Sequence, residues 1–545
     1  MSSERGSNHF VRGAAILGIA GLVSKLLGAL YRIPYQNITG DIGLYVYMQV
    51  YPLYTTLLIL ATAGFPIAIS KIVSERLALG DTSGARRAFR IASISLFILG
   101  FFFFFLLYFG APLISRMMGD EHLTLPLKAV AWSLPLVPLA AILRGYFQGQ
   151  QNMVPTGVSQ VVEQLFRVIF ILVSAYWMMT AYNDAYLAGT GAVFAAFPGA
   201  VGAILVLFYY WRRNNMGQSS VESAVGLAPG VRTWSNRQII RSLLFYALPI
   251  CLGALVLPLI PLIDSMTVLN LLQWSNVPED AAKLAKGAFD RGQPLIQFGT
   301  FFATSLSLAL VPAISEAVTR KQTQVIANRT EVAVRLTLLL GLPASFGLAL
   351  LAEPVNIMLY GDTSGTNALA IQSFTILFAT LSIATSGILQ GLGEVMLPAR
   401  HLFIGVLAKL VLNLALVPLW GISGAAVATV LAYLTAMTLN LIALNRHIKV
   451  KWNKKQLITK PTLAVIIMSV LVLFVEWVTT VIFGGIIGSE RILYTLVGMA
   501  AVMTGGVVYV VALLFTGGIT ADDLRVMPKG GKLLKLFTKL KLVRH

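Results

Sequence analysis

Long apolar runs separated by short polar segments make up most of the chain. Each run holds about 20 residues, the length that an α-helix needs to cross a hydrocarbon core of ~30 Å, whereas membrane β-strands alternate over about ten. The pattern therefore predicts an all-α polytopic membrane protein with about fourteen transmembrane helices. The predicted spans are 11–34, 44–70, 91–115, 127–147, 155–180, 186–211, 243–271, 294–315, 333–353, 368–390, 398–418, 421–445, 461–484 and 492–516.

Charges on the polar segments predict the orientation of these spans. With the N-terminus inside, 31 of the 41 Lys and Arg residues fall on the inner side and six on the outer side. This asymmetry follows the positive-inside rule. We therefore expect a multi-pass protein of a bacterial cytoplasmic membrane with both termini in the cytoplasm, and we interpret the first run as an uncleaved span.

The composition indicates that lipid, not water, surrounds most of the chain. Only 12% of the 545 residues are charged and the mean hydropathy is +0.79, whereas soluble proteins carry about 25% charged residues. Inner loops that face anionic inner-leaflet lipids account for the net charge of +19, so no nucleic-acid partner is expected. The single cysteine, Cys251, excludes an intramolecular disulfide.

Sequence motifs recur at a spacing of about 240 residues. The segment PIAIS at 66–70 recurs as PAIS at 312–315, and GYFQG at 145–149 recurs as GILQG at 387–391. Corresponding spans run in the same direction, which predicts two six-helix lobes related by a parallel pseudo-two-fold axis, plus two extra C-terminal helices. The predicted parts are an N-terminal lobe (1–212), a cytoplasmic linker (213–242), a C-terminal lobe (243–447), helices thirteen and fourteen (461–516) and a basic amphipathic cytoplasmic tail (517–545).

Once the charges near the span ends are assigned to the loops, seven charged side chains remain within the predicted spans, where each costs at least ~2.5–3.5 kcal/mol unless it has a partner or a wet cavity. They are Lys25, Arg32, Glu163, Arg167, Asp264, Lys409 and Glu476. The two lobes hold four cations against Glu163 and Asp264, so their interior is net basic. A basic interior selects an anion, and phosphate or pyrophosphate is the natural membrane-borne choice.

Local spacing gives several of these charges a structural alternative. Lys25 and Arg32 share one helix face, and Arg32 alternatively reaches the outer surface. Glu163 and Arg167 are one helical turn apart, so they can also form a purely structural ion pair. Lys409 occupies the repeat position of Arg167, which favours a ligand shared by the two lobes.

Acidic residues are candidates for coupling or for charge pairing. Asp264 follows Pro258 and Pro261, which we expect to break the helix and expose carbonyl groups to a monovalent cation, with pairing to a cavity lysine as the alternative. Asp290 and Arg291 precede a span at its predicted outer end.

No catalytic motif accompanies these charges. The five histidines are dispersed, and no metalloprotease helix, Gly-rich phosphate loop or nucleophile elbow is present. We therefore predict a transporter, not an enzyme, without a cofactor and driven by the membrane potential or a monovalent cation gradient.

Two segments carry a resemblance to a known family. SKLLGALYR at 24–32 resembles the first helix of polysaccharide-type transporters in the MATE-like (MOP) superfamily, and DRGQP at 290–294 followed by SLSLALVP at 305–312 resembles their eighth span. With fourteen spans, the chain is most similar to the MurJ-type lipid II flippases of Gram-positive spore formers.

The resemblance implies that lipid II, an undecaprenyl-pyrophosphate-linked peptidoglycan precursor, is moved from the inner to the outer leaflet. It further implies a basic central cavity for the headgroup, containing Lys25 and Arg291, and a groove at 461–516 for the lipid tail. Arg32 lies one residue later than the corresponding arginine of the Gram-negative branch, and Leu53 to Thr62 lack that branch's basic residue. Arg167 and Lys409 are our candidates to compensate.

Other functions remain open at this stage. The nearest alternative is a flippase for another lipid-linked glycan, such as a teichoic, capsular or spore-cortex precursor. A cation-coupled multidrug exporter is disfavoured by the four-to-two excess of buried bases. We expect a monomer, with contacts to cell-wall synthesis enzymes as a further expectation.

Overall fold

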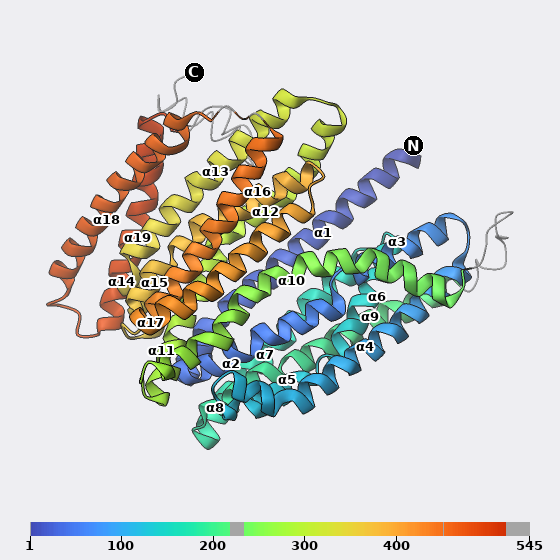
Figure 1. The fold of residues 1–545 in the computed structure, drawn as a ribbon, viewed down its shortest axis with the longest axis horizontal. Helices are drawn as coiled ribbons and strands as arrows, with labels where there is room; N and C mark the ends of the chain where they lie inside the picture. The colour runs from blue at the N-terminus through green and yellow to red at the C-terminus, as the bar shows by residue number, and fades with distance from the viewer. Residues whose placement is uncertain (1, 219–233, 449, 451, 519–545) are drawn as a thin grey trace. The chain divides into compact units, whose positions relative to one another are not determined.

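The computed structural model describes residues 2–218, 234–448, 450 and 452–518. In these residues the regular structure is helical, without a β-strand, and the chain forms two compact units, Met1–Asn270 and Leu271–His545 (Figure 1). The predicted all-α class is confirmed. The predicted tail from residue 519 onward and residues 219–233 of the predicted linker lie outside the described residues.

The first unit is built from long helices joined by short turns. They are α1 (Ser2–Leu30), α2 (Arg32–Thr62), α3 (Phe65–Ala78), α4 (Thr82–Met117), the 3₁₀ turn η1 (Glu121–Leu123), α5 (Thr124–Ala131), α6 (Leu136–Gly149), α7 (Val154–Tyr182), α8 (Ala185–Phe194), α9 (Ala196–Gln218) and most of α10 (Asn236–Trp274).

The second unit contains the remaining helices. They are α11 (Glu279–Asp290), α12 (Gly292–Thr319), α13 (Thr323–Leu350), α14 (Ala352–Tyr360), α15 (Thr366–Gln372), α16 (Phe374–Gly391), α17 (Met396–His447), the π-helical turn η2 (Lys455–Thr459), α18 (Lys460–Phe483) and α19 (Glu490–Phe515).

Twelve helical stretches of the described residues are long and apolar enough to cross a membrane. Two of them, 16–78 and 396–447, are far longer than the ~20 residues that one crossing needs. Both change direction internally, as the fourteen predicted spans require. The exact number of crossings stays a prediction.

The chain reverses at Gly421 in the middle of α17. This glycine has φ 56° and ψ −137°, a conformation that side-chain-bearing residues rarely adopt. On either side of it, the Nζ atom of Lys409 donates to Oγ1 of Thr429 at 2.9 Å, so the two halves of α17 run side by side in opposite directions. The predicted boundary between the spans 398–418 and 421–445 coincides with this turn.

A similar reversal occurs at Gly40 in α2. Gly40 has φ 65°, and the flanking segments pair across it. The hydroxyl of Tyr35 donates to the carbonyl of Gly43 at 2.9 Å, and the hydroxyl of Tyr31 donates to that of Tyr47 at 2.5 Å. This reversal brings a series of tyrosines from both sides of the turn together.

The repeated Gly motif forms a close helix crossing in the first unit. A Cβ atom on Gly145 of α6 would lie 2.6 Å from the carbonyl oxygen of Pro66 in α3, and one on Gly149 would lie 2.8 Å from that of Ser70. Small residues let helix backbones approach closely, which is how helices associate in lipid.

The second copy of the motif makes the corresponding crossing between α16 and α12. A Cβ atom on Gly391 would lie 3.0 Å from the carbonyl oxygen of Val311, and the hydroxyl of Ser315 donates to the carbonyl of Gly391 at 3.0 Å. Both copies therefore pair the Gly motif with the Pro–Ser motif, which gives a packing reason for the sequence repeat.

Helix α10 differs from the sequence expectation in two ways. It continues through Pro258 and Pro261, so the predicted break before Asp264 is wrong. Prolines are tolerated inside membrane helices, because neighbouring groups and local adjustments satisfy the freed carbonyls. In addition, α10 packs on the first unit, where Gln49 donates to the carbonyl of Ser265 at 2.6 Å, although the repeat places 243–271 in the C-terminal lobe.

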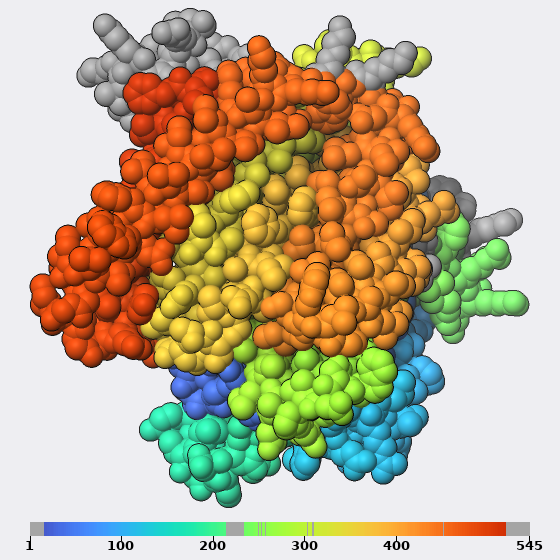
Figure 2. All heavy atoms as spheres, turned by 60° about the vertical axis from the view of Figure 1, so that its left-hand side comes forward, coloured from blue at the N-terminus to red at the C-terminus, as the bar shows by residue number. Residues whose placement is uncertain are grey.

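Within the second unit, helices α18 and α19 pack against each other and against α13 and α14. In Figure 2 their red and dark-orange atoms border the yellow surface of the α13–α14 region. The hydroxyl of Tyr509 in α19 donates to the carbonyl of Leu339 in α13 at 2.8 Å, within a shared apolar cluster. Other side chains of α18, including Val470 and Trp477, are exposed and fit contact with lipid.

Candidate functional site

Three charged side chains meet inside the first unit. Glu163 of α7 accepts from Nη2 of Arg144 in α6 at 2.8 Å and from Nη2 of Arg167 at 2.9 Å, one contact on each carboxylate oxygen. The side chains of this arginine–glutamate triad are only 12–14% exposed. Two guanidinium groups share one carboxylate, so the triad carries a net positive charge.

The local sequence explains how the triad is assembled. Arg144 directly precedes Gly145, where α6 crosses α3 closely. Its Nε donates to the hydroxyl of Ser159 at 2.9 Å, so α7 holds this guanidinium at a second point. On the opposite side, Gly199 of α9 permits close packing, because a Cβ atom there would lie 3.0 Å from the carbonyl oxygen of Glu163.

A cluster of tyrosines lies beside the charged groups. This tyrosine cluster consists of Tyr31, Tyr35, Tyr47, Tyr51 and Tyr54, with neighbouring ring centroids 5.2–6.0 Å apart. Tyr47 and Tyr51 lie within electrostatic range of both Arg32 and Arg167. The hydroxyl of Tyr54 is buried without a hydrogen-bond partner.

Arg32 is buried in this cluster. The residue is 6% exposed, and the Nε and Nη1 atoms of its guanidinium group have no hydrogen-bond partner. A buried donor without an acceptor costs about 1–3 kcal/mol, and more when the group is charged. Arg32 is therefore enclosed by protein instead of reaching the surface, and its Nε and Nη1 donors have no acceptor.

Lys25 lies two turns before Arg32 on α1 and is exposed. It forms no ion pair with any other described residue of the chain. One turn later, Gly28 brings α1 close to α7, where a Cβ atom would lie 3.1 Å from Nε2 of Gln164. Lys25, Arg32 and Arg167 are thus the predicted substrate-binding cations that the first unit contains.

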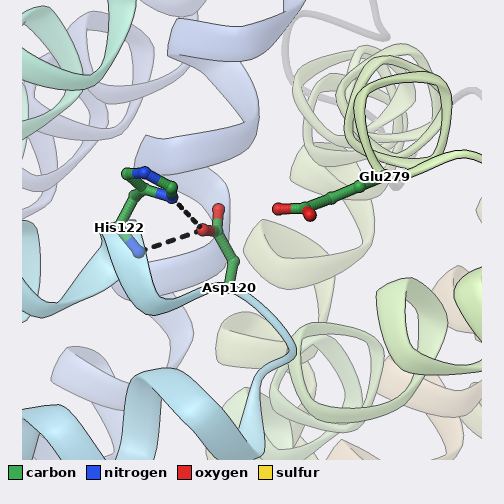
Figure 3. Close-up of side chains that lie close together, drawn as sticks. All are labelled: Asp120, His122 and Glu279. Carbon is green, nitrogen blue, oxygen red and sulfur yellow. Dashed lines mark hydrogen bonds and ion pairs between the residues drawn. The ribbon is translucent and has the colours of Figure 1, made fainter.

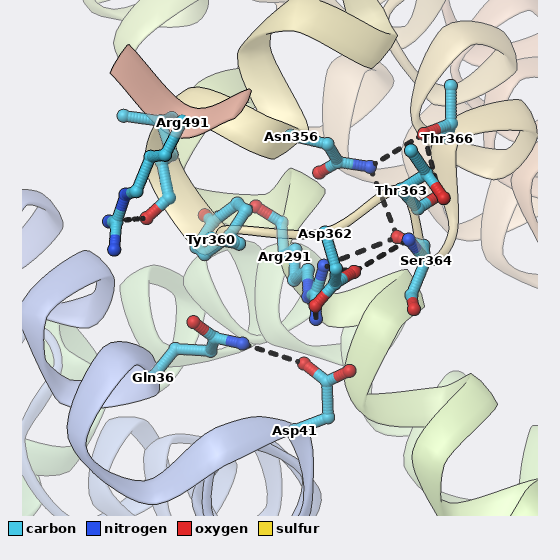
Figure 4. A network of polar contacts seen from close by, with 11 residues as sticks. Gln36, Asp41, Arg291, Asn356, Tyr360, Asp362, Thr363, Ser364, Thr366 and Arg491 are labelled. Carbon is cyan, nitrogen blue, oxygen red and sulfur yellow. Dashed lines mark hydrogen bonds and ion pairs between the residues drawn. The ribbon is translucent and has the colours of Figure 1, made fainter. Parts of the chain in front are cut away.

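Arg291 in the second unit is held in a local network (Figure 4). It is 1% exposed, and Nη1 and Nη2 contact the two oxygens of Asp362 at 2.7 and 2.8 Å. The Arg291 guanidinium lowers the pKa of Asp362 to about 2. The hydroxyl of Tyr360 donates to the carbonyl of Arg291 at 2.9 Å, so the arginine ties its helix to the α14–α15 turn.

The other predicted site residues of the second unit are also engaged. Nζ of Lys286 lies 2.6 and 2.7 Å from the oxygens of Asp290, and both residues are buried. Lys409 is 0% exposed and donates to Thr429 across the α17 reversal. In the first unit, Asp264 is 2% exposed. Their roles in binding or coupling stay predictions.

Sequence reasoning missed several polar groups that the structure assembles. Arg144 is one of the 31 basic residues that the charge pattern assigns to the inner side, because it lies near the end of the predicted span 127–147, yet its partner is Glu163. A second missed group is centred on Asp120, which accepts from the hydroxyls of Tyr45 and Tyr186 at 3.0 and 2.7 Å. Figure 3 shows its other oxygen, 3.1 Å from Nδ1 of His122.

Comparison with known proteins identifies the family. A sequence profile described as "Polysaccharide biosynthesis protein" matches residues 10–318, more than half of the chain. A second profile, "Lipid II flippase MurJ", matches residues 291–496. The chain belongs to the MurJ-type flippase family. It is therefore a multi-pass membrane transporter, not an enzyme, as the sequence predicted.

Individual relatives extend over nearly the whole chain. It is 34% identical to "Uncharacterized membrane protein YabM" of Bacillus subtilis, with 97% of both chains covered. It is 30% identical to "Lipid II flippase MurJ" of the same organism, with 92% of this chain and 94% of the relative covered. It is also 28% identical to "Stage V sporulation protein B", with 96% and 99% covered.

Solved structures share the fold at low sequence identity. "Lipid II flippase MurJ, inward closed conformation" matches with a TM-score of 0.62 at 15% identity, covering 91% of this chain and 98% of that one. An inward-facing multidrug resistance MATE family transporter matches with a TM-score of 0.64 at 15% identity, covering 80% and 98%. These similarities show that the chain shares its fold with MurJ and MATE transporters.

Proposed function

We propose that this protein moves lipid II from the inner to the outer leaflet of a bacterial cytoplasmic membrane by alternating access. The observation that carries the proposal is the excess of buried positive charge in the first unit of a flippase-family protein. Arg32 is buried. Arg144 and Arg167, whose side chains are only 14% and 12% exposed, share one carboxylate, that of Glu163. A diphosphate supplies acceptor oxygens for the unsatisfied donors, which are Nε and Nη1 of Arg32 and Nε of Arg167.

The charge arrangement favours an anionic headgroup over a cationic drug. Guanidinium groups bind phosphate oxygens through short, charge-assisted hydrogen bonds, and these bonds strengthen in a low-dielectric interior. Cationic cargo would face like charges at Arg32 and at the triad. The resemblance of the fold to MATE transporters therefore does not extend to an organic cation as cargo.

The remaining parts of the proposal concern the order of contacts, the energy source and the setting in the membrane. Lys25, being exposed, makes the first contact with the diphosphate, whereas Arg32 and Arg167 hold it. No cofactor is required, because the membrane potential supplies about 2.3 kcal/mol per charge and 100 mV, or a monovalent cation gradient supplies equivalent work. Both termini lie in the cytoplasm and the protein acts as a monomer, with anionic inner-leaflet lipids around its basic loops.

A second candidate is a flippase for another lipid-linked glycan, such as a teichoic, capsular or spore-cortex precursor. It is supported by the 28% identity to "Stage V sporulation protein B" of Bacillus subtilis, and the chain is about as similar to the uncharacterized YabM (34%) as to MurJ (30%). A diphosphate joins lipid and sugar in both cases, so the basic groups alone do not separate them.

Two measurements test the proposal. A strain depleted of its own lipid II flippase should grow when this protein is expressed, and lipid II should become accessible at its outer leaflet. Lys25→Ala should reduce both without lowering the amount of membrane protein, whereas Lys321→Ala, at an exposed loop lysine, should not. Membrane expression without rescue would refute lipid II as the cargo and favour the second candidate.

A further inference from the structure

We infer that Arg144 is a positioning residue that converts the Glu163–Arg167 ion pair from a neutral group into an anion-binding one. The inference deepens the proposed function and rests on it, because it concerns the anionic part of the transported lipid. It assigns a role to a residue that lies near the end of its span and that the charge pattern alone places among the inner loops.

The geometry shows how Arg144 acts. Its Nη2 donates to Oε2 of Glu163 at 2.8 Å, and Nη2 of Arg167 donates to the other oxygen, Oε1, at 2.9 Å. An arginine and a carboxylate alone tend to form a two-point, fork-like pair that uses both oxygens. Here that pairing is not formed, and Nε of Arg167 is buried without a hydrogen-bond partner.

Charge counting leads to the same conclusion. Glu163 and Arg167 are spaced one turn apart on α7 and would cancel each other if they were alone. Arg144 adds one positive charge to a group that is only 12–14% exposed. Because water screens such a group poorly, the surplus charge attracts an anion, and phosphate oxygens fit the unsatisfied guanidinium donor.

Arg144 is held firmly enough for this role. Its Nε donates to Ser159 at 2.9 Å, and the hydroxyl of Thr156 donates to its backbone carbonyl at 3.4 Å. A simpler reading of these contacts is a structural tie between α6 and α7. The two readings predict opposite results for a double substitution, which makes them separable.

The decisive comparison uses four variants of the full-length protein in lipid nanodiscs. Arg144→Gln leaves a neutral Glu163–Arg167 pair, so affinity for lipid II should fall roughly tenfold. Arg144→Gln combined with Glu163→Gln restores a single positive charge at Arg167, so affinity should return toward that of the unaltered protein. Arg144→Lys keeps the charge and should stay within about threefold. Arg320→Gln breaks an exposed surface pair and should change nothing.

The readouts separate anion binding from structural damage. Lipid affinity is measured with lipid II and with undecaprenyl pyrophosphate, and thermal stability is measured on the same samples. A structural tie predicts that the double variant is weaker and less stable than Arg144→Gln, which would overturn the inference. If Arg144→Gln does not fold, the double variant is compared with Arg144→Lys instead. A lower lipid affinity of the double variant then overturns the inference, and a similar affinity supports it.

The two lipids distinguish this inference from the proposed function. Binding of undecaprenyl pyrophosphate without binding of lipid II refutes lipid II as cargo, whereas the Arg144 effect is still measured on the diphosphate. Equal affinity of the unaltered protein and Arg144→Gln for both lipids refutes the inference and leaves the cargo assignment intact. Failure to bind either lipid refutes both.

Discussion

Replacing Gly145 with alanine tests the helix crossing that both halves of the chain repeat. The added Cβ atom would lie 2.3 Å from Cγ2 of Ile69, 2.6 Å from the carbonyl oxygen of Pro66 and 2.7 Å from its Cα. Side-chain rotation relieves the first contact, but the backbone contacts require α3 and α6 to separate by about 1 Å. Such overpacking costs ~1–3 kcal/mol of unfolding free energy.

The measurement is the free energy of unfolding in mixed micelles, compared among three variants. Gly21→Ala is the matched control, because a Cβ atom there meets nothing within 4 Å and alanine gains up to ~1 kcal/mol of helix propensity. Gly387→Ala should lie between the two, since its closest contact is the rotatable hydroxyl of Ser307 at 2.1 Å. Equal stability of Gly145→Ala and Gly21→Ala would refute the crossing as described.

Two further substitutions test local features of the second unit. The pKa of Asp362 is lowered to about 2 beside Arg291, so this ion pair stabilises the folded state above the ordinary carboxyl pKa of about 4 and is lost as the pH falls toward 2. Asp362→Asn should therefore cost about 1 kcal/mol at pH 7, given an aspartate that is 47% exposed, and the difference in melting temperature should vanish near pH 2. Gly421→Ala should cost ~1–3 kcal/mol, because alanine is strained at φ 56° and ψ −137°. Gly485→Ala, without close neighbours, should be neutral, and urea or SDS unfolding measures both.

Hydrophobic length was a reliable guide to the fold. Apolar runs of membrane-crossing length can form only helices or closed barrels in lipid, and no run alternated, so the all-α class followed directly. The turn at Gly421 was also predictable, because both flanking runs are long enough to cross. The prolines of α10 were misleading, since a proline breaks a helix in water more readily than one whose neighbours satisfy the freed carbonyls.

The candidate site was only partly predictable, because sequence places charges along a helix but not across helices. The Glu163–Arg167 pair followed from its spacing of four residues. Arg144 contacts the same carboxylate from α6, and no residue near it in the sequence indicates a partner 19 residues away. Likewise, the aromatic surroundings of Arg32 depend on the reversal at Gly40, whose effect on side-chain positions appears only in the folded chain.

The repeat places Arg167 and Lys409 at equivalent positions, yet the structure gives them different surroundings. Arg167 retains a buried donor without an acceptor, whereas Lys409 is 0% exposed and donates to Thr429 across the α17 reversal. If these surroundings reflect their roles, Lys409→Met should destabilise the protein and Arg167→Met should chiefly weaken lipid affinity. Burial of a group whose partner is lost costs about 1–3 kcal/mol, so the first effect is measurable by unfolding.

Measuring the free energy of unfolding and the lipid affinity of both variants decides between two hypotheses. Either Arg167 and Lys409 have different roles, or both bind one shared ligand. A ligand held by both lobes requires each substitution to weaken binding by a similar factor, as the repeat alone would suggest. If the two residues have different roles, Lys409→Met should mainly lower stability and Arg167→Met should mainly lower lipid affinity. A similar loss of affinity in both, at unchanged stability, would show that the buried lysine leaves its hydroxyl partner to meet the cargo.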